Sequence, residues 1–251
     1  MNNTATLEKM NQMKLYGMSR AFKTTLEAGM NHKFTTDELM AHLIDAEWDE
    51  RYNRKLNRLI QLAKFRYQAS LEQLDFTLNR NLDKNTILRF SDANWIKERR
   101  NIIITGPTGV GKSFIAAALG HQACVLGFKT VYYNCSKLFP NLLLFRADGT
   151  YVKQINKIQK QDVLILDDFG LQKLEIQSRL ALLEILEDRH GIKSTVIVSQ
   201  LPVSSWHEII GDKTIARQPP GDRIIHTAYR LEMQGESVRK KYQNNGSKPA
   251  T

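Results

Sequence analysis

The hydrophobic pattern of the chain changes character between residues 75 and 95. Before this division, apolar residues recur three or four positions apart, as in Leu56, Leu59 and Ile60, which is the spacing of one helix face. After it, short β-branched runs such as NIIIT at Asn101–Thr105 alternate with segments of helical pattern. The pattern predicts an all-helical first part followed by an α/β part.

The second part contains five expected strands and two well-marked helices. The strands are predicted at Asn101–Thr105, Lys129–Tyr133, Asp162–Leu166, Thr195–Ser199 and Thr227–Met233. The helices are predicted at Ser113–Leu126 and Ser178–Asp188. Strands that alternate with helices form βαβ units, in which the strands are parallel and helices cover both faces. We therefore predict an α/β fold with a mainly parallel five-stranded sheet flanked by helices.

Two helices are expected in the first part. One spans about Thr6–Ala28, although its apolar residues form no clean stripe. The other begins at Thr35, because Thr35 can cap a helix and Glu38, three residues later, can bond back to it. We predict a small helical domain over residues 1–75, an α/β domain over 76–242 and a polar tail over 243–251.

The chain is basic, with a formal net charge of +10 and a pI of about 9.6. Between Arg51 and Leu71 there is no acidic residue. Four cations in that stretch recur at i, i+3, i+4 and i+7 and share one helix face: Arg51, Arg54, Lys55 and Arg58. A row of cations is suited to a phosphate backbone, and the alternative interpretation is a solvated helix face.

Cysteine usage and hydropathy give no sign of a metal, disulfide or membrane role. Cys124 and Cys135 lack metal-ligand spacing, so two buried thiols are expected. The start, Met1–Met10, has no apolar stretch of the kind found in a secretory signal. No apolar run approaches the roughly 18 residues that span a bilayer. We expect a soluble, cytoplasmic protein.

The stretch GPTGVGKS at Gly106–Ser113 fits the G-x-x-x-x-G-K-[ST] phosphate-loop pattern at every fixed position. An expected strand precedes it and an expected helix follows, which is the context that the motif requires. Its glycines allow backbone N–H groups to point inward, and the helix N-terminus adds positive charge. The residues expected to bind ATP are Gly106, Pro107, Thr108, Gly109, Val110, Gly111, Lys112 and Ser113. Lys112 can reach the β- and γ-phosphates, and the Ser113 hydroxyl can ligate Mg²⁺.

Two carboxylates follow the apolar run VLIL, at Asp167 and Asp168. The carboxyl ends of parallel strands lie at one edge of the sheet, beside the phosphate loop. Asp167 is placed to hold Mg²⁺, and Asp168 is the better candidate to polarise an attacking water. Together with the loop, the pair predicts an ATPase, with the α/β domain as its ATPase domain.

Polar residues later in the chain add candidates for the same site. Ser199 and Gln200 end the next expected strand, where a side chain can reach a γ-phosphate; a simple turn before Pro202 is the alternative. Arg223 and Arg239 remain as candidates to stabilise the charge of a phosphoryl-transfer transition state, and position alone does not choose between them.

With these residues in place, the chain resembles the IstB-like helper ATPases of bacterial insertion sequences, relatives of the helicase loader DnaC within the AAA+ class. The stretches that carry the resemblance are GPTGVGKSFIAAALGHQA, DVLILDDFGL, TVIVSQLPVSSWHEIIGD and DRIIHTAYRLEMQGESVRK, with MKLYGMSRAF and DAEWDERYNRKLNRLIQLAKF in the helical part. The resemblance implies a DNA-binding ATPase that forms an ATP-dependent homo-oligomer on duplex DNA, mostly without sequence preference, and recruits or activates a transposase.

The resemblance also implies roles for individual residues. It implies sensor roles for Gln200 and Ser199, an arginine finger at Arg223 acting on a neighbouring subunit, and a nucleotide-contacting second sensor at Arg239. It further implies an extra helix within Leu138–Lys160, of the kind found in initiator-type AAA+ proteins. The basic residues expected to meet DNA there are Arg146, Lys153, Lys157 and Lys160.

One stretch departs from the family pattern. Pro219, Pro220 and Gly221 stand just before Arg223 and should break a helix, which predicts that the finger arginine lies on a loop or is displaced. Two other functions also remain open from the sequence. One is a DnaC-like helicase loader, whose first domain binds a helicase, and the other is a P-loop kinase without a nucleic-acid role.

Overall fold

The computed structural model describes residues 3–29, 33–206 and 228–238. The chain divides into two compact units between Arg58 and Leu59, so the boundary expected at residue 75 falls inside the second unit. The division lies within one long helix, α3 (Thr36–Ala63). Among the described residues, no helix combines the length and the hydropathy that crossing a membrane requires.

The first unit is helical, as predicted, but the single helix expected over Thr6–Ala28 is wrong. The segment forms two helices, α1 (Asn3–Gln12) and α2 (Tyr16–Glu27), with a break in which Lys14 has a φ of 60°. A left-handed residue cannot continue a right-handed helix, so the chain turns there. The poor apolar stripe of this segment is consistent with the break.

Helix α3 is tied to α2 through a carboxylate. Glu47 of α3 accepts hydrogen bonds from the backbone N–H groups of Gly17 and Met18 at 2.8 and 3.2 Å, and so satisfies the N-terminus of α2. A Cβ at Gly17 would lie 2.2 Å from the Ala46 carbonyl oxygen, so this close approach requires glycine.

The expected start of α3 is confirmed. The Thr35 backbone N–H donates to the Glu38 carboxylate at 2.8 Å, and the Glu38 N–H donates to the Thr35 hydroxyl at 3.3 Å. These reciprocal bonds are the capping box that the sequence predicts.

The second unit is built on the predicted five-stranded parallel sheet, with strand order β2-β3-β4-β1-β5. The strands are β1 (Asn101–Thr105), β2 (Thr130–Asn134), β3 (Val163–Phe169), β4 (Ser194–Ser199) and β5 (Ala228–Glu232). The helices are α4 (Lys84–Ser91), α5 (Asn94–Lys97), α6 (Lys112–Val125), α7 (Cys135–Ala147), α8 (Tyr151–Gln159) and α9 (Ile176–Arg189), with 3₁₀ turns η2 (Leu71–Gln73) and η3 (Val203–Ser205).

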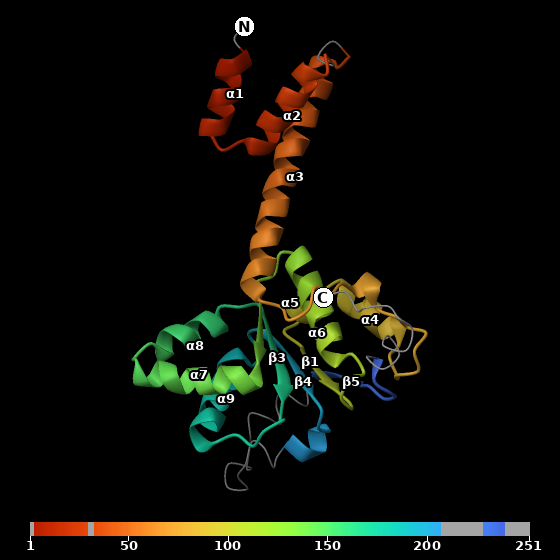
Figure 1. Ribbon diagram of the computed structural model, residues 1–251, viewed down its shortest axis with the longest axis vertical. Helices are drawn as coiled ribbons and strands as arrows, with labels where there is room; N and C mark the ends of the chain where they lie inside the picture. The colour runs from red at the N-terminus through yellow and green to blue at the C-terminus, as the bar shows by residue number, and fades with distance from the viewer. Residues whose placement is uncertain (1–2, 30–32, 207–227, 239–251) are drawn as a thin grey trace. The chain divides into compact units, whose positions relative to one another are not determined.

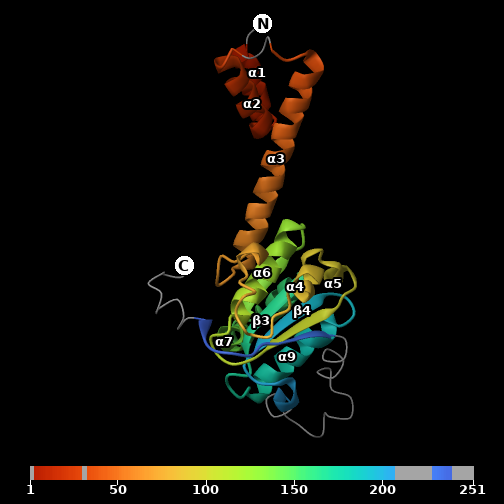
Figure 2. The same cartoon turned by 90° about the vertical axis from the view of Figure 1, so that its right-hand side faces the viewer.

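The sheet separates two hydrophobic cores. In β1, Ile102 and Ile104 face one core and Ile103 faces the other, because alternate side chains of a strand point to opposite faces. Helices α4, α5 and α6 cover the first face, and α7, α8 and α9 cover the second (Figure 1). At the β5 edge, Phe90 of α4 packs against Tyr229 with ring centroids 5.4 Å apart, and α4 and α5 face the viewer in Figure 2.

A buried arginine at the end of α9 forms hydrogen bonds to backbone groups at the starts of β3 and β4. Arg189 is only 1% exposed, and its guanidinium donates to backbone carbonyls of Ile158, Gln161 and Ser194 at 3.0, 2.8 and 2.5 Å. Burial lowers the pKa of Arg189 to about 10, so the side chain stays charged at neutral pH. Arg189 thereby joins α8, α9 and β4 on the side of the sheet covered by the second core.

Candidate nucleotide-binding site

The phosphate loop connects β1 to α6 and depends on three glycines with positive φ. Gly106, Gly109 and Gly111 have φ values of 144°, 89° and 96°. A Cβ at Gly106 would lie 2.3 Å from the Met233 carbonyl oxygen, and one at Gly109 would lie 2.2 Å from the Ser237 hydroxyl. Side chains are therefore excluded both by backbone conformation and by the segment that follows β5.

Lys112 is the first residue of α6 and lies inside the loop. It is 7% exposed, and its ammonium donates to the carbonyls of Gly106 and Pro107, each at 2.7 Å. Burial lowers the pKa of Lys112, against the opposing effect of Asp167 and Asp168. The ammonium is thus held at the mouth of an N–H-lined loop, which is where a nucleotide's phosphates bind in such motifs.

Ser113 and Asp167 lie in contact beside this lysine. The Ser113 hydroxyl donates to one Asp167 carboxylate oxygen at 3.0 Å, and the Tyr132 hydroxyl donates to the other. Asp167 is fully buried, and burial together with its carboxylate raises the pKa of Tyr132, so this phenol remains a donor. A hydroxyl and a carboxylate side by side are oxygen ligands of the type that Mg²⁺ takes alongside phosphates and water.

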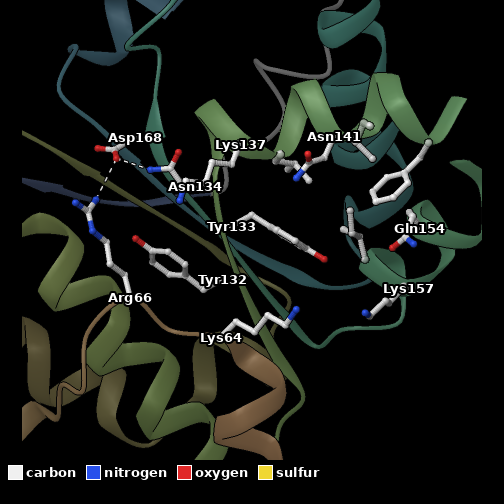
Figure 3. A pocket seen from close by; sticks show the side chains of 14 residues that line it. Lys64, Arg66, Tyr132, Tyr133, Asn134, Lys137, Asn141, Gln154, Lys157 and Asp168 are labelled. Atoms are coloured by element: carbon white, nitrogen blue, oxygen red, sulfur yellow. Dashed lines mark hydrogen bonds and ion pairs between the residues drawn. The ribbon is translucent and has the colours of Figure 1, made fainter. Parts of the chain in front are cut away.

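Asp168 follows in β3 but points into a different environment. The pairing of β3 with β4 shifts register between Leu166 and Phe169, and Asp168 has a φ of 57°. A non-glycine residue in the left-handed region of φ costs on the order of 1 kcal/mol. Strained residues of this kind are often found at functional sites. The Asp168 carboxylate accepts from Asn134 at 2.6 Å and forms an ion pair with Arg66 at 3.3 Å (Figure 3).

The two residues at the end of β4 have separate roles. The Gln200 side chain accepts a hydrogen bond from the Thr108 hydroxyl of the phosphate loop at 2.7 Å. Ser199 is fully buried, donates to the Phe169 carbonyl at 2.8 Å and accepts from the Leu201 N–H at 3.0 Å. Gln200 therefore reaches the nucleotide loop, whereas the Ser199 hydroxyl fixes the turn after β4.

Both late arginines lie outside the described residues, so their expected roles stay predictions. The described segment before Arg239 does reach the site. The Val238 N–H donates to the Gly109 carbonyl at 2.9 Å. Arg223, with Pro219 and Pro220 before it, falls in the stretch 207–227.

Four residues of the site were not anticipated: Tyr132, Asn134, Arg66 and Arg80. Arg80 is 6% exposed, donates to the Val110 carbonyl at 3.2 Å, and lies where a Cβ on Gly111 would come within 2.8 Å of it. These residues come from segments far apart in the sequence, and none belongs to a recognisable local motif. Only the fold brings them to the loop and the aspartates.

The cations expected to contact DNA lie on exposed surfaces. On α3, Arg51 pairs with Glu47 at 2.6 Å and Arg54 pairs with Glu50 at 3.3 Å, so carboxylates one turn earlier partly neutralise the row. Within the described residues, Lys55 and Arg58 form no ion pair.

Two helices meet the region Leu138–Lys160: α7, which begins before it at Cys135, and α8, which lies wholly inside it as the additional helix expected there. Gly149, with a φ of 75°, lies between them. Arg146 at the end of α7 lies over the Tyr151 ring at 4.1 Å. Lys153 and Lys157 are exposed on α8, one helical turn apart.

Solved structures with this fold include helicase loaders and replication initiators. The crystal structure of the DnaC helicase loader matches with a TM-score of 0.58 at 21% identity, over 68% of this chain and 99% of that chain. The replication initiator DnaA bound to AMPPCP and single-stranded DNA matches with a TM-score of 0.56 at 14% identity, over 75% of this chain and 58% of that one. At these identities the likeness establishes the P-loop AAA+ fold alone.

Relatives identified by sequence share more identity with this chain than these solved structures do. The insertion sequence ATP-binding protein y4pL of Sinorhizobium fredii (strain NBRC 101917 / NGR234) is 44% identical over 235 residues, covering 94% of this chain and 96% of that protein. The ATP-binding protein of insertion sequence IS1162 from Pseudomonas fluorescens is 41% identical over 201 residues, covering 80% and 87%. A family model described as "IstB-like ATP binding protein" matches residues 8–246. The chain therefore belongs to the family of IstB-like ATP-binding proteins.

Proposed function

We propose that this chain is a Mg²⁺-dependent ATPase that assembles on duplex DNA and recruits or activates a transposase of its insertion sequence. The observation that carries the proposal is the junction of the phosphate loop with β3, where Ser113 contacts buried Asp167 and Lys112 lies beside both. This junction combines phosphate recognition with a metal-compatible oxygen pair, and Asp168 adds a second carboxylate one residue later.

The chemistry follows from what each side chain can do. Lys112 and the loop N–H groups bind the phosphates, while Ser113 and Asp167 would hold Mg²⁺. Held there, Mg²⁺ would supply positive charge against the phosphates. Asp168 orients and deprotonates the attacking water. Gln200 accepts a hydrogen bond from Thr108 of the loop and is the candidate to contact the same water. Arg223 from a neighbouring subunit and Arg239 complete the site in this proposal.

The DNA role is supported by charge and by relatives. The chain carries a net charge of +10, and exposed cations lie on α3 and α8. Rows of lysine and arginine bind phosphates and not base edges, so binding without strong sequence preference is expected. The relatives are named as insertion sequence ATP-binding proteins, which supports the proposal that the partner is the transposase of the same element.

A DnaC-like helicase loader is the second candidate. It is favoured by the fold likeness to the DnaC helicase loader, which covers almost all of that chain. A pull-down with the host replicative helicase and with the transposase separates the two functions. Retention of the helicase alone would favour the loader.

The proposed function is tested by a gel-shift titration of a long duplex with and without ATP. We expect stable complexes of several subunits that form with ATP and weaken as salt rises. The Lys112→Ala variant should lose the dependence on ATP, and Lys97→Ala, a charge change on the exposed end of α5, should not. Failure to bind duplex DNA under either condition would reject the DNA role.

A further inference from the structure

Arg80 is a buried cation beside the phosphate loop, and no step of the proposed chemistry uses it. It lies in the segment between η2 and α4 and is 6% exposed. Its guanidinium donates through Nη1 to the Val110 carbonyl at 3.2 Å and through Nη2 to the Asp75 carbonyl at 2.5 Å. A Cβ on Gly111 would come within 2.8 Å of Nη1. The guanidinium therefore packs directly against the Val110–Gly111 peptide of the loop.

The bond to the Val110 carbonyl also orients the other end of that peptide. A trans peptide is planar, and its C=O and N–H groups point in opposite directions. While Arg80 holds the carbonyl, the Gly111 N–H points away from Arg80. The preceding peptide is held in the same way, because the Val238 N–H donates to the Gly109 carbonyl at 2.9 Å. Two successive N–H groups of the loop are thus oriented by donors at the opposite ends of their peptides, and successive N–H groups form the concave anion site of such loops.

Arg80 can orient the loop because its own backbone is fixed. The Arg80 carbonyl accepts a hydrogen bond from the Gln234 N–H at 3.1 Å. A Cβ on Gly235 would lie 2.5 Å from the Asn79 carbonyl oxygen, so the two segments touch there without room for a side chain. The backbone of Arg80 is therefore joined to the segment after β5, and its side chain crosses from there to the loop.

An arginine is suited to this position because of the shape of its donor group. The planar guanidinium presents several N–H donors in a fixed arrangement, and here two of its nitrogens reach carbonyls of two different segments. A lysine would keep the charge, but its ammonium is a single point at the end of a flexible stem. The two-pronged contact is thus a property of arginine.

We propose that Arg80 is a positioning residue for nucleotide binding: by holding the Val110 carbonyl, it aims the Gly111 N–H at the phosphates of the bound nucleotide. The inference rests on the proposed function, in which Gly106–Ser113 binds ATP, and adds to that site a residue from outside the loop. The N–H groups of such loops contact the α- and β-phosphates, which ATP and ADP share. Loss of the guanidinium should therefore weaken the binding of both nucleotides to the same extent.

The binding effect is measured by calorimetric titration of Arg80→Met with ATP and with ADP. Methionine keeps much of the apolar stem and removes the donors. The Kd for both nucleotides should rise about tenfold, the loss expected when one hydrogen bond to a charged phosphate is weakened. Arg89→Met, on the exposed side of α4, is the matched control and should bind like the unaltered chain. An unchanged Kd for ADP in Arg80→Met, or a loss confined to ATP, would overturn the proposal.

Steady-state kinetics separates positioning from a general loss of folded protein. Contacts to the α- and β-phosphates are the same before and during transfer, so Arg80→Met should raise the KM for ATP about tenfold and change kcat by less than about twofold. A role in stability alone would reduce the number of active molecules, which lowers the apparent kcat and leaves KM unchanged. That second pattern would overturn the proposal.

The conservative variant and hydrogen exchange test the orientation itself. Arg80→Lys keeps the charge without the two-pronged donor, so its Kd should stay close to that of Arg80→Met; recovery to the unaltered value would overturn the geometry in favour of charge alone. At saturating ADP, exchange of the Gly111 N–H should be markedly faster in Arg80→Met than in the unaltered chain, while the centre of α6 exchanges alike in both. Equal protection of the Gly111 N–H would contradict the proposal.

Lys112→Ala, titrated alongside, distinguishes failure of this inference from failure of the proposed function. Normal ATP affinity in Arg80→Met together with weak binding in Lys112→Ala would overturn the role of Arg80 and leave the proposed site standing. Normal affinity in both variants would reject the loop as the nucleotide site and overturn both.

Discussion

The phosphate loop and the exposed cavity beside Asp168, which is lined by Lys64, Lys137 and Lys157, both suit anions, but they are built in opposite ways. The loop uses eight consecutive residues, backbone N–H groups and a lysine that is 7% exposed. The cavity uses long side chains from four separate segments, and its lysines are exposed. A rigid, buried site gives tight and selective binding, whereas an exposed one gives weaker binding that salt and competing charges can change.

The two aspartates of β3 divide between these regions. Asp167 is fully buried and accepts hydrogen bonds from Ser113 and Tyr132, so it lies on the fixed side, where we propose that Mg²⁺ binds. The backbone of Asp168 is left-handed, and its carboxylate contacts Arg66. Asp168 therefore lies toward the exposed cavity. Adjacent residues can play these separate roles because the register shift of β3 redirects the second side chain.

The largest effect is expected at the loop. Lys112→Ala removes the only loop ammonium, and the loss of charge-assisted hydrogen bonds to phosphate should weaken ATP binding by about two orders of magnitude. Calorimetric titration with ATP and Mg²⁺ measures this. Lys97→Ala is the control, and near-normal ATP affinity in Lys112→Ala would refute the assignment of the loop.

A smaller effect is expected for Tyr132, whose hydroxyl donates to Asp167. Tyr132→Phe removes the donor to a buried Asp167 oxygen, which should lower the free energy of unfolding by about 1–3 kcal/mol. Tyr133→Phe is the matched control, because that hydroxyl faces the cavity. Chemical denaturation of both variants measures the difference. Equal stability would mean that Asp167 gains nothing from Tyr132.

The burial of Lys112 should also affect the pH dependence of ATP binding. Burial lowers the pKa of Lys112 below its ordinary value of 10.5, and phosphates bind the charged form, which raises that pKa again. ATP affinity should therefore fall as pH rises through the lowered pKa, with proton uptake on binding in that range. Affinity that stays constant up to pH 10.5 would show that the ammonium is not perturbed.

The smallest effects are expected on the basic face of α3. Arg51→Gln breaks the pair with Glu47 and should cost up to about 1 kcal/mol of stability in the helical unit. Arg58→Gln should leave stability unchanged and lower the salt slope of DNA binding by about 1. Thermal denaturation and a salt titration measure the two. The reverse pattern would mean that Arg58 is structural.

Much of the fold and the loop could be predicted from local sequence. The β-branched runs of β1 and β4 and the capping box at Thr35 carry their structure within a few residues, so their bounds were predicted to within one or two positions. Gly106–Ser113 could be identified because the motif is contiguous. The break at Lys14 and the boundary at residue 58 could not, since neither leaves a strong periodic signal.

The partners of the aspartates could not be predicted because they are not local. Arg66 lies 102 positions from Asp168 and Asn134 lies 34 positions away, and only the sheet order brings them together. Arg51 and Arg54 were read as an open cation row because the carboxylates that pair with them stand one turn earlier. A run of cations in the sequence shows only which residues are charged. Whether each cation pairs with a carboxylate depends on which residues the helix brings to the same face.

The central claim is that the phosphate loop and the aspartate pair form one ATP-hydrolysing site. The most direct test is phosphate release and ATP binding measured side by side for the unaltered chain and for Asp168→Asn, with and without Mg²⁺. The unaltered chain should release phosphate only with Mg²⁺, and Asp168→Asn should bind ATP with similar affinity while its turnover falls about 10²-fold or more. Unchanged turnover in Asp168→Asn, or turnover without Mg²⁺, would contradict the account.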